Sequence, residues 1–126
     1  MYKLAVKTDF IAQHFLIGGD WGSENQRHSH HYQLEIQLAG KTPDNHGYLM
    51  DIVKIKDYLD KLIAHYRDKT LNDLPEFKDL NPSIENLALI LHQGLSRSMH
   101  DIETSELTVK IWEDENVWAS YQQDIS

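Results

Sequence analysis

RHSHHYQLEIQL, residues 27–38, is the stretch that decides how this chain is expected to fold. From Tyr32 to Leu38 its even-numbered residues are aromatic or aliphatic, and polar residues stand between them. This alternation predicts a strand with one buried face. The first two even positions of the same strand are His28 and His30, so both imidazoles are expected to point the same way.

The residues before this strand predict another strand and a loop. Tyr2, Leu4 and Val6 alternate with Lys3, Ala5 and Lys7, which is again the period of a strand, and residues 10–16 are expected to continue it. The segment 18–23 holds three glycines and is expected to be a loop, because it clusters residues that break regular structure.

The residues after the central strand predict a turn and two helices. A turn is expected over residues 41–47, which contain proline, aspartate and asparagine in succession. Apolar residues then recur at steps of three and four over 52–66, the pattern of an amphipathic helix. Asn81-Pro82-Ser83 supplies cap candidates and a first-turn proline for a second helix, whose apolar face extends to Leu95.

Two more strands are expected near the end of the chain, at 107–111 and 117–122. The resulting order is ββααββ, so the predicted fold class is α+β, with an antiparallel four-stranded sheet and both helices on one face. The sequence has no internal repeat, low-complexity run or linker, and residues 1–126 are therefore expected to form one domain.

Composition excludes several classes of function. The formal net charge of −8 argues against a nucleic-acid-binding protein, because phosphate backbones are held by lysine and arginine. The chain has no cysteine, which excludes disulfides, thiolate metal ligands and a thiolate nucleophile. Residues 1–10 lack the apolar run of a signal peptide, and no stretch is long and apolar enough to cross a membrane. We therefore expect a cytoplasmic protein.

The spacing of three histidines suggests a metal site. His28 and His30 have Cα atoms roughly 6–7 Å apart on one side of a strand, so both can reach one metal ion. His14, on the preceding element, is a candidate third ligand. Three histidines with an open fourth position are typical of catalytic zinc. The spacing alone agrees equally well with an exposed cluster that binds no metal, because H-x-H is a short pattern.

Five segments, in order and in register, resemble one enzyme family. The chain is similar to the 6-pyruvoyl-tetrahydropterin synthases and to the bacterial 6-carboxy-tetrahydropterin synthases of queuosine biosynthesis, from about residue 8 to residue 121. The family motifs F-x-A-A-H-R-L and L-H-G-H-N-Y correspond here to FIAQHFL (10–16) and RHSHHY (27–32). The family segment that leads into the first helix corresponds to GYLMD (47–51). The motif L-N-D…N-P-T-x-E-x-L-A corresponds to TLND (70–73) with NPSIENLA (81–88), and the motif E-T corresponds to WED (112–114).

The resemblance implies a fold, a cofactor and an assembly. Family members share the tunnelling fold, in which the sheets of several subunits form one barrel, typically a hexamer built from two trimers. Such assembly would cover the edges of a small open sheet. The resemblance also implies that Zn²⁺ is bound by the family's ligand positions, which here are His14, His28 and His30.

The resemblance further implies a pterin site at a subunit interface. The family glutamate that holds the amino-pyrimidine edge corresponds to Glu113, and a carboxylate can accept two parallel N–H bonds from such an edge. The alternative interpretation of Glu113 is a solvated turn residue. Ser83 and Glu85 fall in the segment that lines the same pocket in relatives.

The sequence departs from the family at the catalytic positions. The family cysteine, four residues before the first histidine of H-x-H, is replaced by Glu24. The Asp-His pair before L-N falls on Arg67-Asp68, so Asp68 and its neighbour on the helix, His65, are the candidates for the missing proton relay. The interpretation favoured by the sequence is that His65 caps the helix end.

Two classes of function follow from these substitutions. The first is a zinc-dependent pterin lyase that breaks a carbon–oxygen or carbon–carbon bond in the side chain of a dihydroneopterin-triphosphate-like substrate, with Glu24 moving the proton. A family subgroup with glutamate in place of cysteine is thought to give 6-hydroxymethyl-dihydropterin for folate synthesis in this way. The second is a zinc- and pterin-binding oligomer with little or no turnover.

Overall fold

Four antiparallel strands form one sheet, and they lie in it in the order in which they occur in the chain. The structure is a computed structural model that describes residues 1–102, 104 and 106–124. Two long strands pair with each other along their whole length and two shorter strands follow. The strands are β1 (Tyr2–His14), β2 (His28–Gly40), β3 (Glu106–Trp112) and β4 (Trp118–Asp124).

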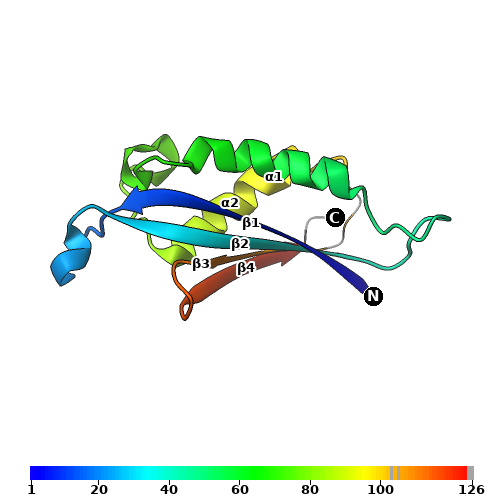
Figure 1. Cartoon of the computed structure of the whole chain (residues 1–126), viewed down its shortest axis with the longest axis horizontal. Helices are drawn as coiled ribbons and strands as arrows, with labels where there is room; N and C mark the ends of the chain where they lie inside the picture. Colours follow the sequence, from blue (N-terminus) through cyan, green and yellow to red (C-terminus); the bar gives the residue numbers. More distant parts are fainter. Residues whose placement is uncertain (103, 105, 125–126) are drawn as a thin grey trace.

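Two helices, α1 (Ile52–Tyr66) and α2 (Ile84–Ser98), lie side by side over one face of this sheet (Figure 1). Each begins where the sequence supplies a cap. The Asp51 side chain accepts a hydrogen bond from the Lys54 amide, and Ser83 accepts one from the Asn86 amide. The predicted α+β class and ββααββ order are confirmed. Three short 3-10 turns complete the described structure, at Gly22–Asn25, Leu71–Asp73 and Pro75–Phe77.

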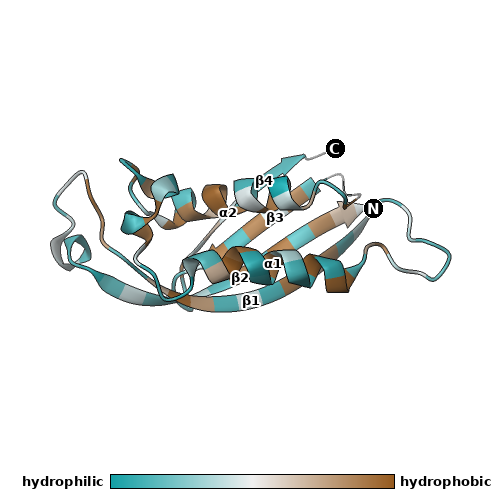
Figure 2. Cartoon of the chain, turned by 90° about the horizontal axis from the view of Figure 1, so that it is seen from above, coloured by the Kyte–Doolittle hydropathy of each residue, from teal (hydrophilic) through white to brown (hydrophobic). Residues whose placement is uncertain are grey.

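The core lies between the helices and the sheet. Apolar and polar residues alternate along the strands, and Figure 2 shows this as alternating brown and teal bands. On the helix-facing side the rings of Phe10 and Tyr32 stack with centroids 5.2 Å apart. The two helices close this layer with buried aliphatic residues, among them Ile55, Leu59, Ile63, Leu87, Leu91 and Leu95.

The register of β1 against β2 brings the three histidines together. His14 is the last residue of β1 and faces His28, the first residue of β2, and Ala12 faces His30. Because the strands are antiparallel, the end of the first must meet the start of the second. The predicted third ligand therefore lies beside the other two.

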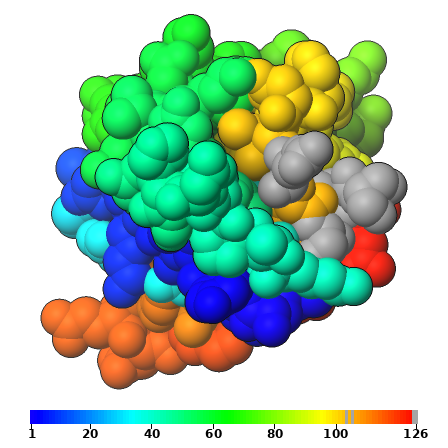
Figure 3. Space-filling view, turned by 90° about the vertical axis from the view of Figure 1, so that its right-hand side faces the viewer, coloured from blue at the N-terminus to red at the C-terminus, as the bar shows by residue number. Residues whose placement is uncertain are grey.

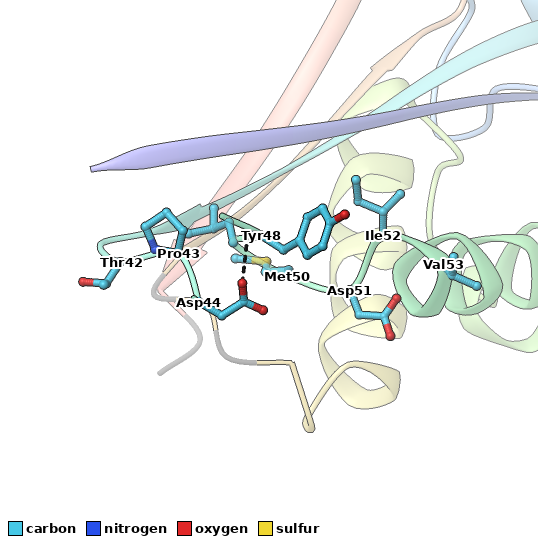
Figure 4. A pocket seen from close by; sticks show the side chains of 9 residues that line it. Thr42, Pro43, Asp44, Tyr48, Met50, Asp51, Ile52 and Val53 are labelled. Carbon is cyan, nitrogen blue, oxygen red and sulfur yellow. Dashed lines mark hydrogen bonds between the residues drawn. The ribbon is translucent and has the colours of Figure 1, made fainter. Parts of the chain in front are cut away.

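The other end of these strands carries a different surface. The start of β1 and the loop after β2 lie side by side there, around hollows whose lining includes Tyr2, Pro43 and Tyr48 (Figure 3). One hollow, of about 670 Å³, is drawn in Figure 4 and lies between this loop and the first turn of α1. It is a full strand length away from the histidines, because it lies at the opposite end of β2.

Candidate metal centre

The imidazole rings of His14, His28 and His30 form a triangle at the edge of the core. Their ring centroids are separated by 4.6 Å (His14–His28), 4.8 Å (His14–His30) and 4.9 Å (His28–His30). His14 is buried, whereas His28 and His30 are half-buried. The structure thus brings together the three residues that the sequence predicts as metal ligands.

Backbone carbonyls accept hydrogen bonds from the Nδ1 atoms of two of these rings. Nδ1 of His14 lies 2.8 Å from the Pro82 carbonyl oxygen, and Nδ1 of His28 lies 2.7 Å from the Gln26 carbonyl oxygen. A carbonyl can only accept, so both Nδ1 atoms must carry their hydrogen. In the neutral rings Nε2 then has a free lone pair, which is how outer partners orient metal-binding histidines.

The Nε2 atoms of the three rings have the arrangement that suits a shared cation. Nε2 of His14 and Nε2 of His28 are 3.0 Å apart, and two lone pairs at this distance repel each other unless a positive centre lies between them. Nε2 of His30 is buried and has no hydrogen-bond partner among the described residues. A single proton between two of the rings leaves the third unsatisfied, whereas one metal ion satisfies all three. The donor set fits zinc.

Glu24 adds a carboxylate to this cluster. Its Oε2 atom lies 3.0 Å from Nε2 of His28. One ligand atom from each of Glu24, His14, His28 and His30 lies within 4.8 Å of the others. The 3-10 turn at Gly22–Asn25 carries Glu24 on the loop between β1 and β2, and about half of its side chain (49%) is exposed. Glu24 therefore lies beside the three histidines that the sequence predicts as metal ligands.

Two asparagines tie the segment after His14 to the rest of the fold. The Asn72 side chain accepts a hydrogen bond from the Phe15 amide and donates one to the Phe15 carbonyl, at 3.0 and 2.9 Å. The Asn81 side chain accepts from the Ile17 amide at 3.0 Å. Asn72 and Asn81, from the L-N-D and N-P-S segments, therefore fix the backbone that follows His14.

The buried position of His14 favours the neutral form of its ring. It lowers the pKa of His14, and the neighbouring imidazoles of His30 and His28 lower it further, against the opposing hydrogen bond to Pro82. A lowered pKa keeps the ring neutral to lower pH, and the neutral ring is the form that binds a metal.

Glu113 lies close to the same cluster, at the turn between β3 and β4. It follows Ile111 at a spacing of two, so it continues the row of helix-facing positions. Burial raises the pKa of Glu113, Glu24 and Glu85 raise it further by like charge, and His30 opposes them. A shallow hollow of about 600 Å³ adjoins Glu113, with Trp112 and residues of β2 in its lining.

The other predicted substrate-binding residues lie at the start of α2. Ser83 caps the helix, so its hydroxyl is already engaged with the Asn86 amide at 3.2 Å. Glu85 stands exposed in the first turn and acts electrostatically on Glu113. The Pro82 carbonyl, which holds His14, belongs to the same segment. The start of α2 is thus next to the metal centre.

The predicted proton-relay residues have other partners. Nε2 of His65 lies 2.9 Å from a Glu76 carboxylate oxygen, which also accepts a hydrogen bond from the Tyr66 hydroxyl. Asp68 adopts a left-handed backbone with φ of 62°, and its amide donates to the Ile11 carbonyl at 2.7 Å. His65 therefore links α1 to the segment after it.

Two further contacts had no signal in the sequence. Asp9 and His31 form an ion-pair contact of 2.6 Å, although they are 22 residues apart, because β1 and β2 place them diagonally. The buried Tyr32 packs against His14 and His30, and its hydroxyl lies 3.4 Å from Nδ1 of His14. Burial raises the pKa of Tyr32, with Glu113 adding to the shift. Only the strand register could have predicted these neighbours.

Within the described ranges, neither α1 nor α2 is long and apolar enough to span a membrane.

Comparisons with known proteins agree with the geometry. The sequence model of the family described as 6-pyruvoyl tetrahydropterin synthase matches residues 3–124. The 6-pyruvoyl tetrahydrobiopterin synthase of Dictyostelium discoideum is 33% identical over 97 residues, which are 75% of this chain and 70% of that protein. The dihydroneopterin monophosphate aldolase of Pyrococcus furiosus is 25% identical over 112 residues, which are 88% of this chain and 89% of the aldolase.

A solved structure shows the same fold. The 6-pyruvoyltetrahydropterin synthase of Plasmodium vivax, determined as a variant in which a catalytic glutamate is replaced by alanine, superposes with a TM-score of 0.80. The sequence identity is 15%, and the match covers 98% of each chain.

Proposed function

This chain belongs to the 6-pyruvoyl tetrahydropterin synthase family, and on that premise we propose that it is a zinc-dependent lyase acting on a pterin side chain. The substrate we propose is a phosphorylated dihydroneopterin, and Glu24 takes the role of the family cysteine. One observation carries the proposal, namely the 3.0 Å contact between the Glu24 carboxylate and Nε2 of His28.

Two relatives support a carboxylate-based reaction. The related protein of Pyrococcus furiosus is named for aldol cleavage of a dihydroneopterin phosphate. In the Plasmodium vivax synthase, the glutamate replaced by alanine is a catalytic residue. A catalytic glutamate therefore has a precedent in this fold, and the present chain has no cysteine that could act in its place.

In this proposal, different residues bind the pterin and transfer the proton. Glu113 would accept two parallel N–H bonds from the amino-pyrimidine edge of the pterin and so point the side chain at the histidine cluster. Ser83 and Glu85, at the start of α2, would border the bound pterin. When bound, zinc would supply Lewis acidity toward the oxygens of the substrate side chain.

Glu24 would perform the proton transfer of an aldol-type cleavage. It would remove the proton from the side-chain hydroxyl on the carbon that becomes the aldehyde. The adjacent carbon–carbon bond then breaks, and the carbon that stays on the pterin must receive a proton, which the protonated Glu24 can return. The products would be 6-hydroxymethyl-dihydropterin and a small aldehyde.

We propose that the protein works as an oligomer, with a hexamer of two trimers as the expected form. β1 and β4 are the two edges of the sheet, so each leaves a row of backbone groups for another subunit to pair with. The hollow of about 600 Å³ next to Glu113 opens on the face of the sheet that points away from the helices, where Lys7, His31 and Trp112 line it, and a neighbouring chain would cover it.

A second candidate function is a zinc- and pterin-binding oligomer with little turnover. The observation that favours it is the contact of His65 with Glu76, because this histidine is then engaged away from the metal ligands. One experiment decides between the two. The zinc-loaded protein is incubated with dihydroneopterin monophosphate or triphosphate, and the pterins are identified by mass spectrometry. We expect 6-hydroxymethyl-dihydropterin. Bound but unchanged substrate would favour the second candidate.

A further inference from the structure

We infer that Glu24 is the fourth metal ligand in the substrate-free protein and that the substrate displaces it. The carboxylate would thus close the site at rest and become free to act as a base only when a pterin side chain occupies its place. The inference deepens the proposed function, on which it rests for the identity of the displacing ligand. The ligand role itself rests on the geometry of the described residues.

The four donor atoms have the spacing of a four-coordinate site. A tetrahedral zinc ion with bonds of about 2.0–2.1 Å places its ligand atoms about 3.3–3.4 Å apart. The Glu24–His28 and His14–His28 contacts are both 3.0 Å, and all four donor atoms lie within 4.8 Å of one another. Side-chain rotations would have to shorten the wider separations of the set, which extend up to 4.8 Å.

Hydrogen bonds within the loop fix the backbone that carries Glu24. The Leu16 amide donates to the Glu24 carbonyl at 2.8 Å, which closes the loop on itself. The Asn25 side chain donates to the carbonyls of Leu16 and Gly19 at 3.0 Å, and accepts from the Trp21 amide at 2.6 Å. These four bonds fix the backbone on both sides of Glu24. The loop therefore holds the Glu24 backbone at a position from which the carboxylate reaches the cluster.

The same carboxylate is free to leave. Half of the Glu24 side chain is exposed, at 49%, in contrast to the buried His14. Its departure therefore needs only rotation about side-chain bonds, while the loop keeps its Cα in place. The three histidines, two of which are tied to backbone carbonyls, stay behind as the permanent ligands.

Displacement would couple base activity to substrate binding. A carboxylate oxygen bound to a metal cannot use the same lone pair to take a proton. The pterin side chain carries neighbouring oxygens, which can replace Glu24 on the metal and leave the carboxylate next to the substrate hydroxyl. The glutamate would then be an active base only in the complex.

Metal affinity and the absorption spectrum of the Co²⁺-substituted protein test the ligand role. Zinc affinity is measured by chelator competition for the unaltered protein, Glu24→Gln and Glu113→Gln. We expect Glu24→Gln to weaken zinc by more than the roughly 10–100-fold that loss of an outer partner produces. Glu113→Gln is the matched control, since it removes the same charge near His30 but no ligand. Among these three proteins, the visible absorption bands of Co²⁺ should change in Glu24→Gln and stay as they are in Glu113→Gln.

Glu24→Asp provides a second variant that keeps the charge but shortens the reach by one methylene. It should show changed Co²⁺ bands as well, while circular dichroism confirms that both Glu24 variants are folded. Identical zinc affinity and an identical Co²⁺ spectrum in all the proteins would overturn the ligand role.

Adding dihydroneopterin to the Co²⁺ protein tests displacement. We expect the spectra of the unaltered protein and of Glu24→Gln to become alike, because the pterin occupies the position that Glu24 leaves. Spectra that stay different by the same amount would overturn displacement. These outcomes are independent of turnover. A protein that shows Glu24 ligation but cleaves no dihydroneopterin phosphate would refute the proposed function and leave the ligand role intact.

Discussion

The Nε2 atoms of His14 and His28 face each other across two paired strands at a distance of 3.0 Å, with both Nδ1 atoms held by backbone carbonyls. This arrangement is unfavourable for two neutral imidazoles and favourable around a cation. Zinc binding should therefore stabilise the fold, because a ligand that binds only the folded state adds its binding free energy to stability.

Removing one histidine should remove most of the zinc. In His30→Ala the buried donor whose Nε2 has no other described partner is lost, so we expect bound zinc to fall well below one ion per chain. Atomic absorption of the purified protein after dialysis measures this. His46→Ala and His100→Ala, which change exposed histidines away from the cluster, are the controls. Full zinc occupancy in His30→Ala would contradict the assignment.

The two hydrogen bonds between the Asn72 side chain and the Phe15 backbone should strengthen metal binding. Asn72→Ala removes both hydrogen bonds to Phe15, so His14 should lose its fixed position. Loss of such an outer contact typically weakens metal binding by about 10–100-fold. Asn72→Asp keeps the acceptor for the Phe15 amide, so its zinc affinity should lie between those of the unaltered protein and Asn72→Ala. If chelator competition gives equal zinc affinity for all three proteins, these two hydrogen bonds have no role in metal binding.

Glu113 should control pterin affinity but not zinc content. We expect Glu113→Gln to weaken pterin binding by about 1.5–3 kcal/mol, the range for hydrogen bonds to charged groups. Fluorescence titration with a pterin measures the affinity, and zinc is assayed in the same sample. Unchanged pterin affinity would mean that the site lies elsewhere.

Glu24 should be needed for turnover. Glu24→Gln keeps the size of the side chain and removes the base, so the rate of side-chain cleavage should fall by about 10²–10⁴-fold. The measurement is made with zinc and pterin both saturating, so that weaker metal binding does not enter. Equal rates for the variant and the unaltered protein would exclude Glu24 as the base.

Glu76 should make stability depend on pH. Burial would raise the pKa of Glu76, but hydrogen bonds from its own backbone and from Tyr66, with the nearby His65, lower it overall. A carboxylate with a lowered pKa contributes stability above its unfolded value of about 4.3, and this is lost as the pH falls through the folded value. The melting temperatures of the unaltered protein and Glu76→Gln should differ at pH 7 and converge in acid. A difference that is constant from pH 7 to pH 3 would refute this.

The strands and helices could be predicted from the sequence because their signals are local. Alternation along residues 28–38, steps of three and four over 52–66, and the cap at Ser83 each depend on neighbouring residues, and each predicted element is present. The placement of His28 and His30 on one side of a strand follows from the same period. The family motifs then predicted His14 as the third ligand.

The tertiary structure alone decided which distant residues meet. The register of β1 against β2 sets His14 opposite His28 and places Asp9 beside His31. Closure of the loop after β1 brings the Glu24 carboxylate to 3.0 Å from the His28 ring. His65, predicted as a relay residue on the strength of its position near Asp68, contacts Glu76. Side-chain period is a property of one segment, whereas such distances depend on turn lengths, strand register and packing between segments, which no local pattern encodes.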